Sequence, residues 1–452
     1  MTRIAASPKD NTTLLGHPKG LFVLFLTEMW ERFSFYGMRA ILVLFLIDQM
    51  SGGLGWSDAD ATKFSGFNVL MVYLLGIPGG IVADRYIGQR AAVLSGGILQ
   101  CIGHFLLALS SKYIFFVGLG FIAIGTGLLK PNISTMVGSL YAKGDPKRDS
   151  GFTIFYMGIN IGAALAGIMV GYVGEVYGWH YGFGLAGLGM LIGIATFMAG
   201  QKYLGSINTQ PKERDSKQAN SNTERFNFTK EEKDRLLMIS ICLTAIFTFF
   251  VAFEQAAGLL TVYAKKYTHR YIGSWEVPAS ILQSLNPIFV IGLGPIVALV
   301  WSRLAKRYKR ISSTYKMGIS NIIVALGTLF MVAAVLQRSA SPTGKSDLHW
   351  LFNTYLFYTI GELSLTPIFL SFITKVAPKQ IEASIMGIFF AVVGAGGLTA
   401  GFLGAQASFL GALPVFQTIF CMTLLIGILF IIFNKRLMSL THGSEQAASD
   451  NA

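Results

Sequence analysis

The chain has 452 residues, of which 53% are hydrophobic and only 13% are charged. This balance excludes a soluble globular protein of this length, which would carry far more charge on its surface. Each membrane span needs about 20 residues, so the apolar runs predict an all-α polytopic membrane protein with twelve transmembrane helices.

The net charge of +13 is distributed unevenly along the chain. We place 26 of the 36 Lys and Arg residues in the two termini and in alternate loops, 7 in the other loops, and 3 within predicted spans (Arg32, Arg39 and Lys130). This asymmetry is the positive-inside pattern. It predicts that both termini are cytoplasmic, and it argues against a nucleic-acid partner.

The first apolar run, about Leu21 to Ile47, contains Glu28, Glu31 and Arg32, and Arg39 follows two turns later. Positions i, i+3 and i+4 share one face of a helix. An isolated charge at the centre of the bilayer costs ~3 kcal/mol or more. The cluster is therefore either a structural ion pair at a helix end or a proton and substrate site that lines a polar cavity, and we favour the second interpretation.

Three further stretches stand out in the first half. The turn from Gly79 to Arg90 has the spacing GGxxxDRxxGxR, which resembles the cytoplasmic signature loop of the major facilitator superfamily. Lys130 precedes Pro131 in the fourth apolar run and either extends to an interface or faces a cavity. Asn160, between Gly158 and Gly162, fits interhelical packing and ligand binding equally well.

The polar stretch 201–235 divides the chain into two sets of six predicted spans. It contains no apolar run long enough for additional helices. We therefore predict a cytoplasmic N-terminus (1–20), a six-helix bundle (21–200), a cytoplasmic linker (201–235), a second six-helix bundle (236–436) and a cytoplasmic tail (437–452) that is disordered. Two six-span halves around a site at the midplane are typical of facilitator-type transporters.

The second half adds two carboxylates within its spans, Glu254 and Glu362. With Glu28 and Glu31, they give four negative charges against the three cations, which leaves room for at least one protonated carboxyl. A proton-coupled carrier requires such a group.

The sequence shows no residue pattern that is typical of a cofactor site or of an enzyme active site. The three cysteines, Cys101, Cys242 and Cys421, lie far apart in apolar runs and show no metal or disulfide spacing. No nucleophile is accompanied by a His and an acid. We therefore expect no metal, no cofactor other than protons as the coupling ion, and no enzyme activity.

Six motifs together resemble the proton-dependent oligopeptide transporter family. They are ExxERFSxYG from Glu28, LKPNIS around Lys130, FYxGINxG around Asn160, FEQ around Glu254, QSLNP around Asn286, and GELSLTP around Glu362. The resemblance covers about Leu21 to Lys435. It implies the major facilitator fold and a proton-coupled symporter in the cell (inner) membrane that imports di- and tripeptides by alternating access and works as a monomer in the lipid bilayer.

The resemblance also implies a role for each matching residue. Glu28, Glu31 and Arg32 would couple the proton. Arg39 and Lys130 would hold the peptide carboxylate, and Glu362 would receive the peptide amino group. The remaining pocket residues would be two amides for the peptide backbone and two tyrosines: Asn160, Asn286, Tyr36 and Tyr73.

The resemblance further implies that Glu254 closes the outer side by a contact with Arg39. We predict an alternating contact of Lys130 with Glu362 on the inner side, because a rocking mechanism requires pairs that join the two halves. Two positions depart from the family pattern, because Phe35 replaces a frequent Tyr and Phe389 replaces a frequent Trp. The alternative function is the same fold moving a different anionic small solute with protons.

Overall fold

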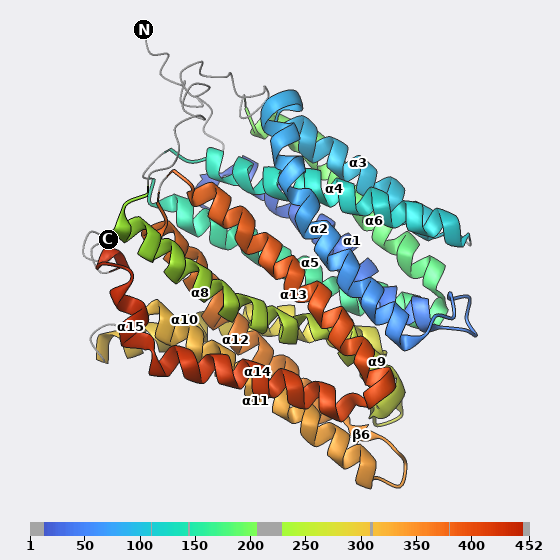
Figure 1. The fold of residues 1–452 in the computed structure, drawn as a ribbon. Helices are drawn as coiled ribbons and strands as arrows, with labels where there is room; N and C mark the ends of the chain where they lie inside the picture. Colours follow the sequence, from blue (N-terminus) through green and yellow to red (C-terminus); the bar gives the residue numbers. More distant parts are fainter. Residues whose placement is uncertain are drawn as a thin grey trace. The chain divides into compact units, whose positions relative to one another are not determined.

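The computed structural model describes residues 13–109, 111–142, 145–205, 228–307, 311–378 and 380–445, and these are almost entirely helical (Figure 1). The chain forms two compact units. The first contains Met1–Met38, Leu75–Val170 and His180–Glu213, and the second contains Arg39–Leu74, Gly171–Trp179 and Arg214–Ala452.

The first unit is built from helices of the first half of the chain, some of which continue into the second unit. Its elements are β1 (Thr13–Leu14), β2 (His17–Pro18), α1 (Lys19–Ile47), α2 (Asp58–Val82), the π-helical turn η1 (Ala83–Ile87), α3 (Gln89–Leu107), α4 (Lys112–Ser139), α5 (Lys147–Tyr177), α6 (Trp179–Gly200) and the short turn η2 (Gln201–Tyr203).

The second unit contains the remaining helices together with the last part of α1, the first part of α2, the end of α5 and the first residue of α6. Its further elements are α8 (Lys230–Phe253), η4 (Glu254–Ala257), α9 (Leu259–Tyr267), β3 (Thr268–His269), β4 (Tyr271–Ile272), β5 (Trp275–Glu276), η5 (Ala279–Ser284), α10 (Leu285–Arg307), α11 (Ser313–Ala340), β6 (Ser346–Asp347), α12 (Leu348–Val376), α13 (Glu382–Leu410), α14 (Ala412–Ile432) and α15 (Asn434–Ser439).

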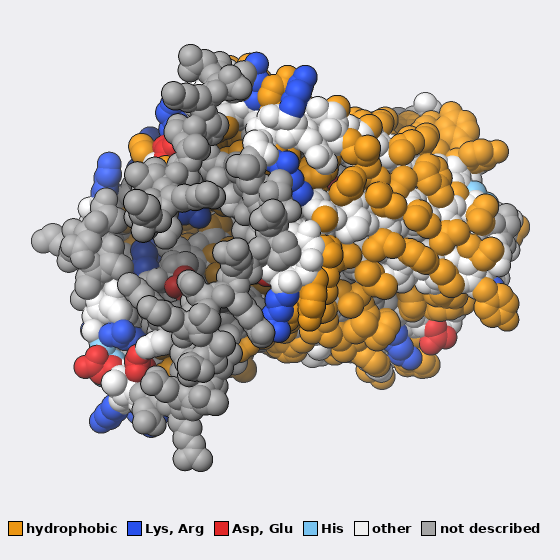
Figure 2. All heavy atoms as spheres, turned by 90° about the horizontal axis from the view of Figure 1, so that it is seen from above, with side chains coloured by type: hydrophobic (Ala, Val, Ile, Leu, Met, Phe, Trp, Pro, Cys, Tyr) orange, Lys and Arg blue, Asp and Glu red, His pale blue; other side chains and the backbone are white. Residues whose placement is uncertain are grey.

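The number of predicted spans agrees with the described helices. Within the described part of the chain, eleven helical segments are long and apolar enough to cross a membrane. Helix α1 would be the twelfth span. It has 29 residues, so its length of roughly 43 Å is sufficient to cross a membrane, but it carries the charged cluster. Figure 2 shows a broad band of hydrophobic side chains on one face, with charged side chains gathered mainly outside that band. The protein is therefore an all-α, multi-span membrane protein.

Small residues allow close helix packing within the first unit. Helices α3 and α4 lie side by side (Figure 1). A Cβ atom on Gly96 of α3 would lie only 2.6 Å from the carbonyl oxygen of Gly125 in α4. Since lipid offers no hydrophobic drive for helix association, such close backbone contact is a principal source of packing energy between spans.

One predicted span is interrupted. Helix α8 ends at Phe253, a 3-10 turn follows from Glu254 to Ala257, and α9 then continues the same span to Tyr267. The interruption falls on the FEQ motif, so Glu254 lies at the start of a tightened turn rather than inside a regular helix.

Hydrogen bonds fix the loop that follows α1. The Asp48 carboxylate accepts bonds from Trp179 Nε1 at 2.7 Å and from the backbone amides of Met50 and Ser51 at 3.2 and 3.0 Å. Partial burial raises the pKa of Asp48, but these hydrogen bonds outweigh it and lower the pKa overall. The end of α1 is thus held against the beginning of α6.

The prediction of a disordered tail from Leu437 is wrong for residues up to 445. Glu445 accepts hydrogen bonds from the backbone N–H and the hydroxyl of Ser313, at 2.9 and 2.6 Å, and so caps the start of α11. His442 Nε2 lies 2.8 Å from Asp234 of α8. Most of the predicted linker, residues 206–227, lies outside the described residues.

Candidate functional site

The charged cluster of α1 forms one buried ion-pair network in the first unit. Arg32 donates from Nη2 to Glu31 Oε1 at 2.6 Å and also from Nε to Glu31 Oε2. Its Nε lies 3.2 Å from Glu28 Oε1, one helical turn earlier. All three side chains are at most 1% exposed. Glu28, Glu31 and Arg32, which the sequence predicted to share one face of the helix, are therefore in contact.

The two carboxylates of this network are not equivalent. Glu31 uses both oxygens on the guanidinium, whereas Glu28 makes one longer contact. Glu28 Oε2 is buried and has no hydrogen-bond partner among the described residues. A buried ionised oxygen without a partner is costly, so the charge of Glu28 is less well compensated than that of Glu31.

Aromatic rings surround the guanidinium. The centre of the Arg32 guanidinium lies 5.1 Å from the Phe35 ring centroid and 5.8 Å from the Tyr36 centroid, both within cation–π range. Phe35, the first departure from the family pattern, thus packs on Arg32 with a ring that offers no hydroxyl. The predicted pocket residue Tyr36 is the second aromatic ring beside the Arg32 guanidinium.

Lys130 and Asn160 belong to the first unit as well. Lys130 lies on α4 directly before Pro131, and its side chain is half-buried. Its positive charge acts on Glu28. Asn160 is buried on α5, and its Nδ2 donates to the carbonyl of Tyr156 on the same helix at 3.0 Å. The first unit therefore connects Lys130 electrostatically with the carboxylate network.

The second unit contains the predicted contact between Arg39 and Glu254. Arg39 Nη2 donates to Glu254 Oε2. The Arg39 side chain is 14% exposed and that of Glu254 is 3% exposed, so the pair is largely desolvated. The ion pair joins α1 to the 3-10 turn that interrupts the α8–α9 span.

Glu362 is held by neighbours within the second unit. Asn286 Nδ2 of α10 donates to Glu362 Oε2 at 2.9 Å and to Thr359 Oγ1 at 3.0 Å. Tyr73 of α2 stacks on Phe390 of α13, with ring centroids 6.2 Å apart and planes 16° apart. An amide of α10, which is remote in sequence from α12, thus orients the Glu362 carboxylate, and an aromatic pair lies in the same unit.

Phe389, the second departure, is 3% exposed and packs on Phe369 and Phe390, with centroid distances of 5.4 and 5.1 Å. It contributes to packing behind Phe390, which is 40% exposed. The contact predicted between Lys130 and Glu362 involves one residue from each unit and stays a prediction.

Sequence reasoning missed several residues that the structure shows in these contacts. Thr359 lies three residues before Glu362 and shares its helix face, so the i, i+3 spacing could have identified it. Phe390 could have been noted beside Phe389. The carboxylates Asp58 and Glu175, which bind lysines of α9, carried no motif signal, because their partners are remote in sequence.

Among the described residues, no group of three or more His, Cys, Asp and Glu side chains could hold a metal ion. The contacts above consist of ion pairs, amides and aromatic rings. Such a set can bind and release charged small molecules and protons.

Known proteins match the chain in both sequence and fold. The family model of the POT family matches residues 90–217 and 206–409. The chain is 35% identical to a peptide transporter of Yersinia enterocolitica, over 96% of this chain and 98% of that protein. It is 32% identical to a di-/tripeptide transporter of Lactococcus lactis, over 84% of this chain and 88% of that protein.

A crystal structure of the peptide transporter POT in complex with sulfate has a similar fold, with a TM-score of 0.88 and 33% identity over 95% of this chain and 97% of that chain. The match therefore extends over nearly the whole chain in both sequence and fold. The chain belongs to the proton-dependent oligopeptide transporter (POT) family, a family of membrane transporters of the major facilitator fold and not of enzymes.

Proposed function

We propose that this protein is a proton-coupled symporter that imports di- and tripeptides across the cell (inner) membrane by alternating access. In this proposal it works as a monomer in the lipid bilayer, has both termini in the cytoplasm, and needs protons as its only coupling ion. The observation that carries the proposal is the buried network of Glu28, Glu31 and Arg32, with one Glu28 oxygen unpartnered among the described residues.

The proton binds Glu28. Glu31 neutralises Arg32 through two hydrogen bonds, so Arg32 remains paired when Glu28 is protonated. Protonation of Glu28 removes a buried charge and gives its second oxygen a hydrogen to donate. Protonation of Glu31 would instead break the shorter contacts to a buried guanidinium, which is the more expensive change.

Lys130 couples the substrate to this proton. Lys130 belongs to the same unit as Glu28, and a positive charge in that unit favours the ionised carboxylate by attraction. When the carboxylate of a peptide binds Lys130, the two charges cancel, the effect on Glu28 weakens, and Glu28 takes up a proton more readily. Peptide and proton therefore promote each other's binding, and the coupling is reciprocal.

The peptide is held by its two charged ends and its backbone. Arg39 and Lys130 bind the carboxylate, and Glu362 binds the amino group. Glu362 is suited to this role because Asn286 holds one of its oxygens at 2.9 Å and so fixes the carboxylate's orientation. The other pocket residues contact the peptide backbone and side chains: Asn160, Asn286, Tyr36 and Tyr73.

Alternating access follows from charge contacts that exchange. The Arg39–Glu254 ion pair closes the outer side, and it must break when Arg39 binds a peptide carboxylate. Lys130 and Glu362 form the corresponding contact on the inner side. Each pair joins residues of the two halves of the sequence, as a rocking mechanism requires.

The test is uptake of a labelled dipeptide into proteoliposomes with and without an inward proton gradient. The proposal predicts accumulation above the outside concentration only when the gradient is present, and competition by unlabelled di- and tripeptides. Competition by an anionic solute without a free amino group, in place of peptides, would instead support a carrier of other anions.

A further inference from the structure

Three buried polar side chains of the first unit have no hydrogen-bond partner within the part of the chain that the structure describes. Gln100 and His104 lie one turn apart on α3, and Thr126 lies on α4. Each of the three is at most 1% exposed. The unpartnered atoms are the amide oxygen and nitrogen of Gln100, both ring nitrogens of His104 and the hydroxyl of Thr126. A buried polar group without a partner is costly, so these atoms point to a bound molecule.

Helix packing brings the three side chains into one stretch of the interface between α3 and α4. Gln100 and His104 are four residues apart and therefore share a helix face. A Cβ atom on Gly125, the residue before Thr126, would lie 2.8 Å from Gln100 Cγ. A Cβ atom on Gly103, the residue before His104, would lie 2.6 Å from a backbone oxygen of α4. The two helices are thus in close contact at the level of these side chains, and the polar atoms are enclosed between spans.

The unpartnered hydroxyl of Thr126 differs from the hydroxyls of other buried threonines. Thr328 and Thr359 in the second unit each donate to the carbonyl four residues earlier, at 3.1 and 2.7 Å, as is usual in a helix. Thr126 makes no such bond to its own helix. Its hydroxyl is therefore available to a molecule bound between helices.

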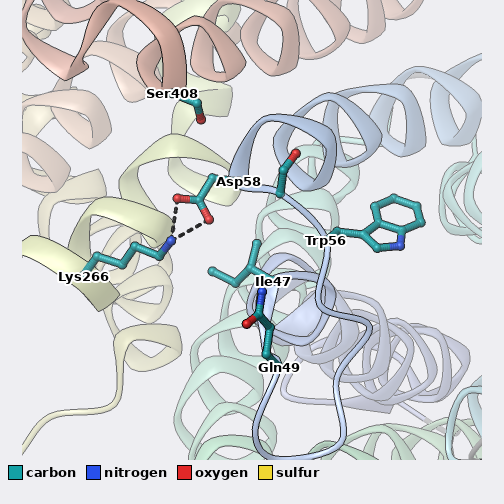
Figure 3. Close-up of a pocket in the computed structure, with 7 residues that line it drawn as sticks. Ile47, Gln49, Trp56, Asp58, Lys266 and Ser408 are labelled. Atoms are coloured by element: carbon teal, nitrogen blue, oxygen red, sulfur yellow. Dashed lines mark hydrogen bonds and ion pairs between the residues drawn. The ribbon is translucent and has the colours of Figure 1, made fainter.

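Polar side chains that bulk water reaches do not need a bound molecule. In the second unit, Lys266 Nζ donates to both oxygens of Asp58, at 2.7 and 2.6 Å, beside a cavity of about 510 Å³ (Figure 3). These two side chains are 42% and 25% exposed, so solvent completes their hydrogen bonding. Gln100 and His104 are 0% exposed, so any partner of their polar atoms must be enclosed within the first unit.

The groups between α3 and α4 favour a small neutral molecule. The Gln100 amide and the Thr126 hydroxyl each donate and accept hydrogen bonds, and a neutral imidazole has one donor and one acceptor. Cys101 and Met190 belong to the packed apolar core of the same unit. A bare ion would lose its hydration there without gaining a charged partner among these residues. Water, which both donates and accepts hydrogen bonds, fits this set of groups.

Helix α6 packs against both α3 and α1. A Cβ atom on Gly97 of α3 would lie 3.2 Å from Met190 of α6, and a Cβ atom on Gly193 of α6 would lie 3.2 Å from Cβ of Trp30 in α1. Different residues of α6 therefore face α3 and the helix that carries the charged network. This arrangement supports a site that is separate from the network of Glu28, Glu31 and Arg32.

We propose that Gln100, His104 and Thr126 bind ordered water inside the first unit and that this water is a structural ligand of the protein. The water bridges α3 and α4 and satisfies polar atoms that neither lipid nor bulk water can reach. Because lipid provides little drive for helix association, such a bridge contributes to the attachment of α3 to α4. The water is bound whether or not peptide and protons are transported, so the site is independent of the proposed function.

Radiolytic footprinting detects such water directly. X-rays split water into hydroxyl radicals, which react before they diffuse far, so a buried methionine is oxidised only beside bound water. Met190 is 0% exposed and lies against Gly97, one turn before Gln100 on α3. Met331 of α11 is the matched control, because it is also 0% exposed and lies one turn from Thr328, whose hydroxyl has protein partners. We expect Met190 to be oxidised faster than Met331, and equally slow oxidation of both would overturn the proposal.

Two variants connect the oxidation of Met190 to the proposed site. His104→Phe combined with Thr126→Val removes most of the polar atoms and keeps the side chains similar in shape. A single remaining amide does not hold a buried water, which needs about two to four polar partners. Oxidation of Met190 should therefore fall to the level of Met331. Thr126→Ser keeps the hydroxyl and should retain the oxidation. Undiminished oxidation in the double variant would place the water elsewhere and contradict the proposal.

Thermal unfolding of Thr126→Val gives an independent result through its sign. If water binds the hydroxyl, this isosteric change removes a hydrogen bond, and the midpoint of unfolding should fall by roughly 1 to 3 °C. If the hydroxyl is unpartnered in a dry interior, the same change removes a costly polar group, and the midpoint should rise. A rise would refute the bound water. A fall without oxidation of Met190 would show that the three side chains bond one another, which would also refute it.

Discussion

Replacing Glu28 and Glu31 one at a time with Gln should have different consequences, although both lie in the same motif. Glu31 makes two hydrogen bonds to Arg32, one of them at 2.6 Å, and Glu28 makes a single contact at 3.2 Å. Removing the principal partner of a buried charge typically costs ~3 to 5 kcal/mol. Glu31→Gln should therefore destabilise the protein, whereas Glu28→Gln removes the weaker contact and a charge with an unpartnered oxygen.

Thermal unfolding in detergent measures this difference. We expect Glu31→Gln to lower the midpoint by on the order of 5 °C or more, and Glu28→Gln to change it by about 2 °C or less. Transport should show a different pattern. Glu28→Gln mimics the protonated side chain, so it should abolish accumulation driven by a proton gradient while leaving exchange of labelled for unlabelled peptide.

Two results would refute this reasoning. A lower midpoint for Glu28→Gln than for Glu31→Gln would show that Glu28 is the main partner of Arg32. Undiminished uphill accumulation by Glu28→Gln would show that the proton does not bind there. Glu28→Asp is the matched control, because it keeps a titratable carboxyl and should retain part of the gradient-driven uptake.

Four further predictions concern the two ends of the peptide, the gate and the topology. Glu362→Ala should lose most of the preference for a free dipeptide over its N-acetylated form. The loss of a desolvated charge contact costs ~2 to 5 kcal/mol, which is roughly 30-fold or more in affinity. An unchanged preference in competition assays would place the amino group elsewhere. Lys130→Ala should likewise lose the preference for a free over an amidated C-terminus. Exchanging the charges of Arg39 and Glu254 should restore more uptake than either single reversal, and a double variant no better than the worse single one would count against direct pairing. A cysteine at Ser206, which lies outside the described residues, should react with an impermeant reagent only from the cytoplasmic side.

The helices and the first charged cluster could be predicted from the sequence because both depend on local spacing. Twelve apolar runs predict twelve spans, and three charges at i, i+3 and i+4 must share a helix face. The difference between Glu28 and Glu31 could not be predicted this way, because it depends on how the Arg32 side chain is oriented between them.

Contacts between remote segments were less accessible to sequence reasoning. The Arg39–Glu254 contact was predicted through family resemblance, whereas Lys265 and Glu175 had no motif to connect them. The tail was predicted to be disordered because it is short and polar. Its order arises from Glu445, which caps α11 through Ser313, a residue more than a hundred positions earlier.

The break at Glu254 had one weak sequence signal, Gly258, at which the 3-10 turn ends. The stretch around Phe253 is apolar and contains no proline, so a continuous helix was the natural expectation. The 3-10 turn depends on contacts made by this segment, among them the ion pair with Arg39 and the hydrogen bond from Gln255 Nε2 to the Ala400 carbonyl at 3.1 Å.

The central claim is that peptide and proton cross the membrane together by way of Glu28. The most direct measurement is the pH inside proteoliposomes, reported by a trapped dye, when an unlabelled dipeptide is added outside under a membrane potential that is negative inside. We expect acidification of the interior by the original protein and none by Glu28→Gln. Peptide entry without acidification, or equal acidification by Glu28→Gln, would contradict it.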